Sequence, residues 1–202
     1  MLRSIFGKGK KKGGKDSGSS AHDDSIMAAK VGDVVSIAGL RLEYDDLYFF
    51  IEKIDRYATH NETWYEALCV EGENQVWLDW SDGYELAITA TDDPDPKGLG
   101  SIGTTEEELI QLDEQHSIDN YIEVDGEKYY YRNSAEVLFY QDNRGPGEGF
   151  YNWDLVQEDG EHVLSITKWE GKPFEATFSE VIPLDRIVLY KGDRGDAGKG
   201  RN

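Results

Sequence analysis

Cysteine, proline and long apolar runs are all scarce in this chain of 202 residues. Its single cysteine, Cys69, excludes a disulfide bond within the chain. No segment approaches the roughly 20 consecutive apolar residues that span a bilayer. The four histidines do not stand at metal-ligand spacing, so we expect no metal and no cofactor. These absences favour a cytoplasmic protein. A peripheral location at the inner face of a membrane is the alternative that we keep open.

Basic residues are also scarce, and they are unevenly placed. The formal net charge is −20, and residues 31–190 hold 36 acidic and only 10 basic residues. An anionic body of this kind repels nucleic acid, so we expect no nucleic-acid partner. Much of this negative charge serves solubility. The same charge also favours a protein partner with a basic surface.

The first 15 residues have the opposite character, because they contain no acidic residue. Three apolar side chains at helical spacing are followed by a run of lysines, a pattern typical of contact with an anionic lipid surface. A solubilising tail is the alternative. The side chains predicted to contact lipid are Leu2, Arg3, Ile5, Phe6, Lys8, Lys10, Lys11, Lys12 and Lys15.

The remaining pattern predicts a mainly β fold of antiparallel meanders, with a duplicated two-half β-barrel or a sandwich as its form. Hairpin turns are indicated at Gly72, Gly126 and Gly160, between segments rich in β-branched and aromatic residues. The segment 47–54 is apolar enough to predict a strand buried on both faces. Segments 128–132 and 135–141 are predicted as two separate strands of the second half. Thr105 and Glu108 have the spacing of a helix cap, so one short helix is expected between the halves.

Five regions follow from this pattern. Residues 1–30 are a basic arm and linker, and residues 31–98 form the first β half. Residues 99–117 are a linker with the short helix, residues 118–190 form the second β half, and residues 191–202 are a polar tail. The arm and the tail are expected to be disordered, because they are too polar to bury apolar surface.

Two aromatic hairpins carry a family resemblance. The features are the apolar segment 47–54, the run 62–68 (ETWYEAL), Trp77-Leu78 after the first turn, and the run 151–169 with Leu164-Ser165 in its returning part. Here the chain resembles a bacterial family, domain of unknown function 4178. The resemblance implies a small β-rich domain with no assigned activity. It also implies a gene neighbourhood of phage-shock-type membrane-stress proteins and polyamine-related genes.

Candidate contact residues come from strand alternation in the segment 75–80. Val76, Leu78 and Trp80 fall on one face, which leaves Trp77 and Asp79 on the other. An aromatic ring in an acidic surrounding suits a basic partner or a polyamine, so these two residues are the predicted partner contacts. Packing between the two halves is the alternative for Trp77. Acid pairs such as Glu66 with Asp79 resemble glycosidase carboxylates, but among 41 acidic residues such pairs are expected by chance.

Nothing in this pattern predicts a catalytic residue. The favoured function is a non-enzymatic accessory or adaptor protein that binds another protein. Its predicted setting is a bacterial membrane-stress system of the phage-shock type, with the basic arm touching anionic lipid. The first alternative is an acidic, immunity-like inhibitor of a basic toxin. The second is an enzyme or a domain that binds a polyamine or another cation.

Overall fold

The computed structural model describes residues 25–81, 87–93 and 95–192. The nine side chains predicted to contact lipid lie outside the described residues, as does most of the polar tail. No helix of the described part is long and apolar enough to cross a membrane.

The described chain consists of eleven strands and one α-helix, with short 3-10 turns between them. The strands are β1 (Val34–Ile37), β2 (Phe49–Ala58), β3 (Thr63–Glu71), β4 (Asn74–Ser81), β5 (Ile88–Thr91), β6 (Tyr121–Val124), β7 (Glu127–Tyr140), β8 (Glu148–Gln157), β9 (His162–Trp169), β10 (Phe174–Val181) and β11 (Ile187–Tyr190). The helix is α2 (Glu106–Gln115), and the 3-10 turns are η1 (Ile26–Ala28), η2 (Leu42–Tyr44), η3 (Leu99–Ile102), η4 (Gln141–Asn143) and η5 (Leu184–Arg186).

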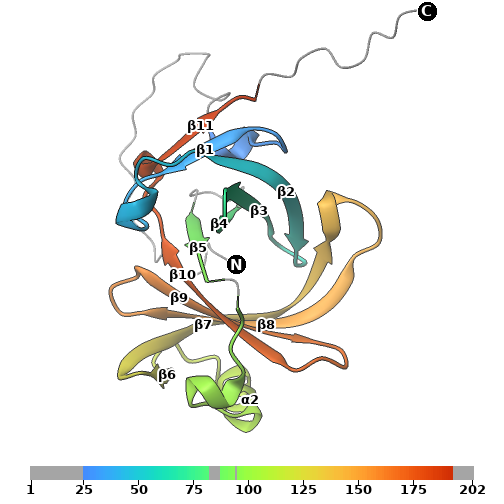
Figure 1. Cartoon of the computed structure of the whole chain (residues 1–202). Coiled ribbons are helices and arrows are strands. Elements are labelled where there is room, and N and C mark those ends of the chain that lie inside the picture. The colour runs from blue at the N-terminus through green and yellow to red at the C-terminus, as the bar shows by residue number, and fades with distance from the viewer. Residues whose placement is uncertain (1–24, 82–86, 94, 193–202) are drawn as a thin grey trace, which may run out of the picture.

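All eleven strands belong to one antiparallel sheet, so the mainly β prediction is confirmed. Their order is β11-β1-β2-β3-β4-β5-β10-β9-β8-β7-β6. A further pairing of β2 with β7 closes eight of them into a ring, from β2 through β5 and β10 back to β7. Figure 1 looks into this ring, with β2 to β5 on one side and β7 to β10 on the other.

The closing seam of the ring is short. Only three residues of β2 pair with β7, among them Tyr57 opposite Phe139. The turn after β7 strengthens the seam, because the buried carboxylate of Asp55 accepts the Asp142 amide at 2.8 Å. Arg56 also donates to the Asn143 side chain at 2.6 Å. Polar contacts of η4 therefore support a seam that the ladder alone holds weakly.

Local turn and cap chemistry is as predicted. Gly72 and Gly160 have φ of 60° and 79°, which suits glycine at the hairpins between β3 and β4 and between β8 and β9. Thr105 caps α2, with a reciprocal bond between its own amide and the Glu108 carboxylate at 2.9 Å. The single helix lies between the fifth and sixth strands, where it was expected.

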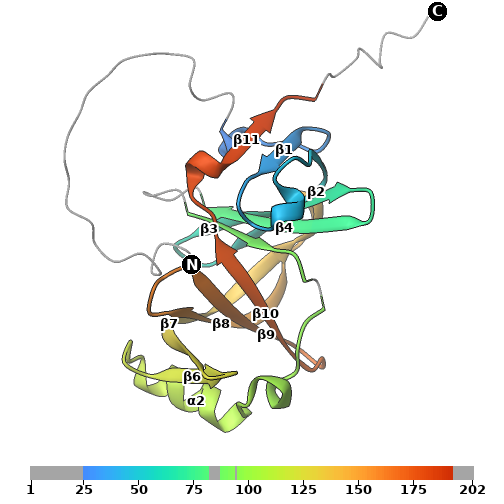
Figure 2. The ribbon, with the colours of Figure 1, turned by 60° about the vertical axis from the view of Figure 1, so that its left-hand side comes forward.

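Two apolar cores lie on the outside of the ring. The first fills the space between β1, β11 and the outer face of β2 to β5, and includes Phe49, Leu78 and Trp80. The second lies under α2 and β6, and includes Leu109 and Leu155. Figure 2 shows β1 and β11 at one end of the molecule and α2 with β6 at the other. The two cores stabilise the ring from its two outer faces.

Two strand predictions were wrong. The segment 47–54 was expected to be buried on both faces, but its strand runs from Phe49 to Ala58 and leaves Phe50 55% exposed. The reason is that Phe49 and Ile51 take the face that packs on the first core, while Phe50 points to the opposite face, which nothing among the described residues covers beside the short pair β1–β11. Segments 128–132 and 135–141 were expected as separate strands. They form one strand, β7, with an irregularity after Tyr131.

Candidate functional site

The inside of the ring is polar apart from a group of aromatic side chains near the seam, because strand alternation sends most apolar side chains outward to the two cores. On β4, Val76, Leu78 and Trp80 are buried in the first core, while Trp77 and Asp79 point into the ring. On β8, Leu155 is buried in the second core while Asn152 and Asp154 face inward. A cavity of about 330 Å³ remains between the inward-facing side chains.

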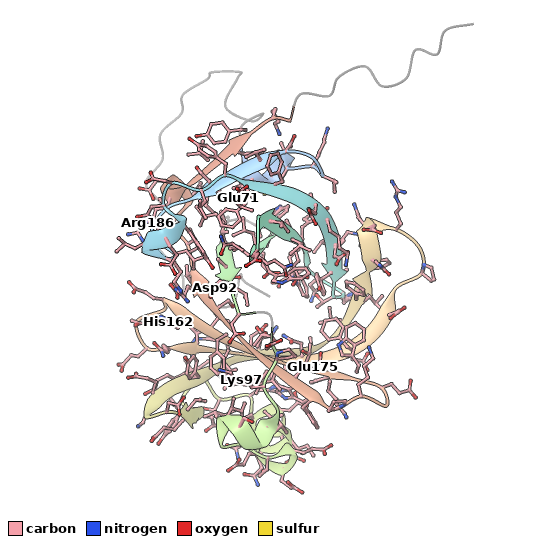
Figure 3. The ribbon with its side chains drawn as sticks, in the orientation of Figure 1. Glu71, Asp92, Lys97, His162, Glu175 and Arg186 are labelled. Carbon is pink, nitrogen blue, oxygen red and sulfur yellow. The ribbon has the colours of Figure 1, made fainter. Side chains whose placement is uncertain are left out.

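Carboxylates dominate this cavity. Five acidic side chains are among the described residues that line it, and no lysine, arginine or histidine is among them. The five are Glu66 on β3, Asp79 on β4, Asp93 after β5, Asp154 on β8 and Glu175 on β10, the last of which is labelled in Figure 3. They come from both sides of the ring, so the cavity is acidic along its whole wall.

Glu66 and Asp79 form the central pair. They stand directly opposite each other in the register of β3 and β4, which brings two like charges onto the same face of the sheet. Burial raises the pKa of Glu66 to about 7, although a hydrogen bond from Tyr57 at 2.9 Å favours its charged form. Burial and the repulsion of Glu66 and Asp154 hold the pKa of Asp79 well above its ordinary range. The pair therefore retains protons near neutral pH.

Asp154 lies on the opposite wall, and its carboxylate accepts more hydrogen bonds than that of Glu66 does. One of its oxygens accepts hydrogen bonds from the side chains of Asn152 and Ser165, both at 2.8 Å. Burial raises the pKa of Asp154, and these two hydrogen bonds oppose that rise. Both donors reach the same carboxylate oxygen, Oδ1.

Aromatic rings form the apolar part of the wall. Tyr57 and Trp64 stack at 5.3 Å between ring centroids, and Phe150 and Trp169 lie 4.5 Å apart. Trp77 adds a fifth ring from β4. Burial raises the pKa of the Tyr57 hydroxyl, so this group stays a hydrogen-bond donor to Glu66. The cavity thus combines negative charge with aromatic faces.

Nearby bases are engaged elsewhere. Lys53 pairs with the buried carboxylate of Asp55 at 2.7 Å. Arg41 forms ion pairs with Asp92 at 2.8 Å and with Glu180 at 2.5 Å. Lys97 lies 5.5 Å from the centre of the Phe178 ring, which packs against the second core on the outside. No basic side chain is among the described lining residues, although the charge of Lys53 nearby acts to lower the pKa of Glu66.

Among the residues that the structure describes, no three His, Cys, Asp or Glu side chains are grouped so that they could hold a metal ion. The cavity acids are spread along the wall instead of converging on one point. This spacing suits a ligand with separated positive charges better than a single hard cation, which needs several oxygens at one centre.

The structure places both predicted contact residues, Trp77 and Asp79, in the cavity wall, half-buried; their role in partner contact stays a prediction. The Glu66–Asp79 pair was expected to arise by chance, but the register makes it the centre of the site. Tyr57, Asp154 and the rest of the wall were not predicted from the sequence. Period-two polarity in β3, β8 and β9 is the signal that points to them, since Glu66, Asp154 and Ser165 alternate with apolar neighbours.

Fold and site together define a class: a small antiparallel β ring with apolar cores outside and an acidic, aromatic cavity inside. The chain belongs to the family described as Domain of unknown function (DUF4178), whose model matches residues 37–184. The matched stretch spans the strands of the ring and the cavity. Neither a curated protein nor a solved structure matches the chain.

Proposed function

We propose that the ring binds an organic cation of the linear polyamine class in its interior cavity. The observation that carries this proposal is the wall itself, where five carboxylates and five aromatic rings meet without a basic side chain among the described lining residues. Ammonium groups are attracted both by carboxylates and by the faces of aromatic rings. Methylene chains between the ammonium groups suit the apolar surface of the same rings.

The size and charge of the cavity support the same class. A volume of about 330 Å³ is at the lower end for small-molecule sites, so the ligand is small. Glu66 and Asp79 face Asp154 across the ring, and each has a raised pKa because burial disfavours its charge. A bound ammonium group reverses that penalty. Cation binding therefore releases protons.

This linkage sets the pH dependence of binding. The amines of a polyamine stay charged below about pH 10. Glu66 loses its proton as the pH rises through about 7, so the affinity for the cation increases between pH 6 and pH 8.

The test is isothermal titration calorimetry of the full chain with spermidine at pH 8 and about 50 mM salt, where surface screening is moderate. We expect saturable binding below millimolar ligand, and a loss of about tenfold in affinity for Asp79→Asn, equivalent to about 1.4 kcal/mol. The absence of heat at millimolar spermidine would end the proposal.

The control for general charge attraction is Glu136→Gln. Glu136 is exposed on β7 and is not part of the cavity wall, and its substitution, like Asp79→Asn, exchanges one carboxyl group for an amide. Unchanged affinity in Glu136→Gln places the binding inside the ring. An equal loss in both variants means that spermidine binds the acidic surface in general.

A second candidate function is the non-enzymatic adaptor, favoured by an exposed apolar sheet face. Tyr48, Phe50, Val188 and Tyr190 are each 44–55% exposed, and Val34 stands opposite both Phe50 and Tyr190 in the register. Such faces on a folded protein mark contacts with other proteins. We propose that a protein partner docks here, while the basic arm touches anionic lipid in a membrane-stress system.

The adaptor proposal is tested by a pull-down from the native host with the wild-type chain and with Phe50→Glu. A protein captured by the wild type and lost in the variant supports it. Identical captures by the two contradict it. Neutralisation of a basic toxin is the remaining proposal from the sequence, and a captured basic nuclease or other toxin would favour it.

A further inference from the structure

The chain carries its own positively charged counterpart to the acidic cavity. Six of its 21 basic residues stand before Asp16, and no acidic residue precedes that position. Residues 25–192, which include the whole ring, have a net charge of −24 from the same sequence. The strongest concentration of positive charge and the acidic cavity therefore belong to one molecule, at an effective concentration that no dilution changes.

The length of this segment lets it reach the ring. The described chain begins at Ser25, which caps η1 beside the first core. An extended chain covers about 3.3 Å per residue, so Lys8 to Lys15 lie within roughly 30–60 Å of Ser25 along the chain. A folded body of this size is about 40 Å across. Residues 16–24 are thus long enough to act as a tether from η1 to an opening of the ring.

The chemistry of the segment matches both parts of the wall. Arg3 and the lysines supply separated cations for Glu66, Asp79 and Asp154. Leu2, Ile5 and Phe6 supply apolar groups for the aromatic rings. This is the same pairing of positive charge with apolar surface that distinguishes a polyamine from a simple metal ion.

We propose that the ring cavity binds the N-terminal segment of its own chain, residues 1–15, and that this segment competes with external polyamine for the site. The inference rests on the proposed cation binding by the cavity. A tether of this length gives an effective concentration in the millimolar range. A segment that binds with a sub-millimolar dissociation constant then lowers the apparent affinity for spermidine by about three- to tenfold.

The first experiment compares two full-length variants that have the same net charge. One replaces Lys10, Lys11 and Lys12 with glutamine. The other replaces Lys128, Arg132 and Lys168 with glutamine, and these three side chains lie over the rings of Tyr121, Tyr130 and Phe174, which do not line the cavity. We expect spermidine to bind the arm variant three- to tenfold more tightly than the wild type, and to bind the outer-face variant within twofold of it. Equal affinities in the two variants overturn the inference while leaving cation binding intact.

The second experiment needs no added ligand. A nitroxide attached to Ser4→Cys, with Cys69 fully buried and unreactive, should broaden the indole NMR signal of Trp77. The broadening should disappear when Lys10, Lys11 and Lys12 are also replaced, and the same chain with the nitroxide reduced is the control. Broadening that is absent in the wild-type arm, or that survives the replacement, overturns the inference.

The two experiments separate the two proposals. If no variant binds spermidine, cation binding by small molecules fails, and the nitroxide result alone decides whether the arm occupies the ring. Anionic lipid is the alternative binding partner of residues 1–15. If replacing the three lysines abolishes sedimentation with phosphatidylserine vesicles but changes neither the spermidine affinity nor the Trp77 signal, the inference fails in favour of lipid.

Discussion

Leu78 and Asp79 are neighbours on one strand, yet they belong to two different regions of the molecule. Leu78 is fully buried in the first outer core, while Asp79 faces the acidic cavity. Small β rings usually fill their interior with side chains for stability. In this protein the two larger apolar cores lie outside the ring, and only a smaller, mainly aromatic cluster around Val137 and Phe150 packs at its seam. The comparison teaches that stability and the candidate function depend on opposite faces of the same strands.

Leu78→Ala is the substitution with the largest expected effect on this comparison. It leaves a cavity in a core where Leu78 has no exposed surface, so we expect the free energy of unfolding to fall by about 2–5 kcal/mol. Urea denaturation followed by far-UV circular dichroism measures it. The neighbouring Asp79→Asn should cost no stability. If both substitutions destabilise the chain alike, the division between faces is wrong.

Glu66→Gln sharpens the comparison from inside the ring. The pKa of Glu66 is raised in the folded chain, so folding favours its protonated form, and ionisation lowers stability as the pH rises from about 4.5 to about 7. Glutamine removes that ionisation. We expect the variant to be more stable than the wild type by roughly 1–3 kcal/mol at pH 8, with little difference at pH 4.

Urea titrations of both chains at several pH values measure this effect. Glu136→Gln is the control, because its carboxylate is exposed on the outside of β7. If the wild-type chain became more stable relative to Glu66→Gln as the pH rose, the account of a buried Glu66 inside the ring would be contradicted.

Thr105→Ala has the smallest expected effect and tests whether the outside is separate from the inside. It removes the cap of α2, whose Leu109 is fully buried in the second core. We expect a loss of about 1 kcal/mol in the free energy of unfolding. The affinity for spermidine should stay unchanged, because α2 lies on the outer face. A changed affinity would mean that the cavity depends on the outer layer.

Local chemistry made much of this fold predictable. The glycine turns at Gly72 and Gly160 and the Thr105 cap have short-range causes, and they place hairpins and helix correctly. Alternation in the segment 75–80 also separated Trp77 and Asp79 from the core face. The exposed start of β2 was not predictable, because hydrophobicity alone does not show which neighbour covers Phe50.

The cavity itself depends on long-range pairing. Glu66 and Asp79 meet through one hairpin, but Asp154 joins them only when β2 pairs with β7 and β5 pairs with β10. Neither pair of strands is joined by a short turn, so no local sequence signal predicts either pairing. Pattern therefore identified the polar faces of single strands, while the enclosure of five carboxylates required the closed ring.

The three-residue seam between β2 and β7 also has a consequence for the order of folding. Its supporting contacts, from Asp55 to Asp142 and from Arg56 to Asn143, join residues 87 positions apart. Such a loop costs conformational entropy before any contact compensates for it, whereas the hairpins on either side form locally. The seam should be among the last parts to gain protection against hydrogen exchange during refolding. A newly made chain then has two meanders but no enclosed carboxylates until this final closure.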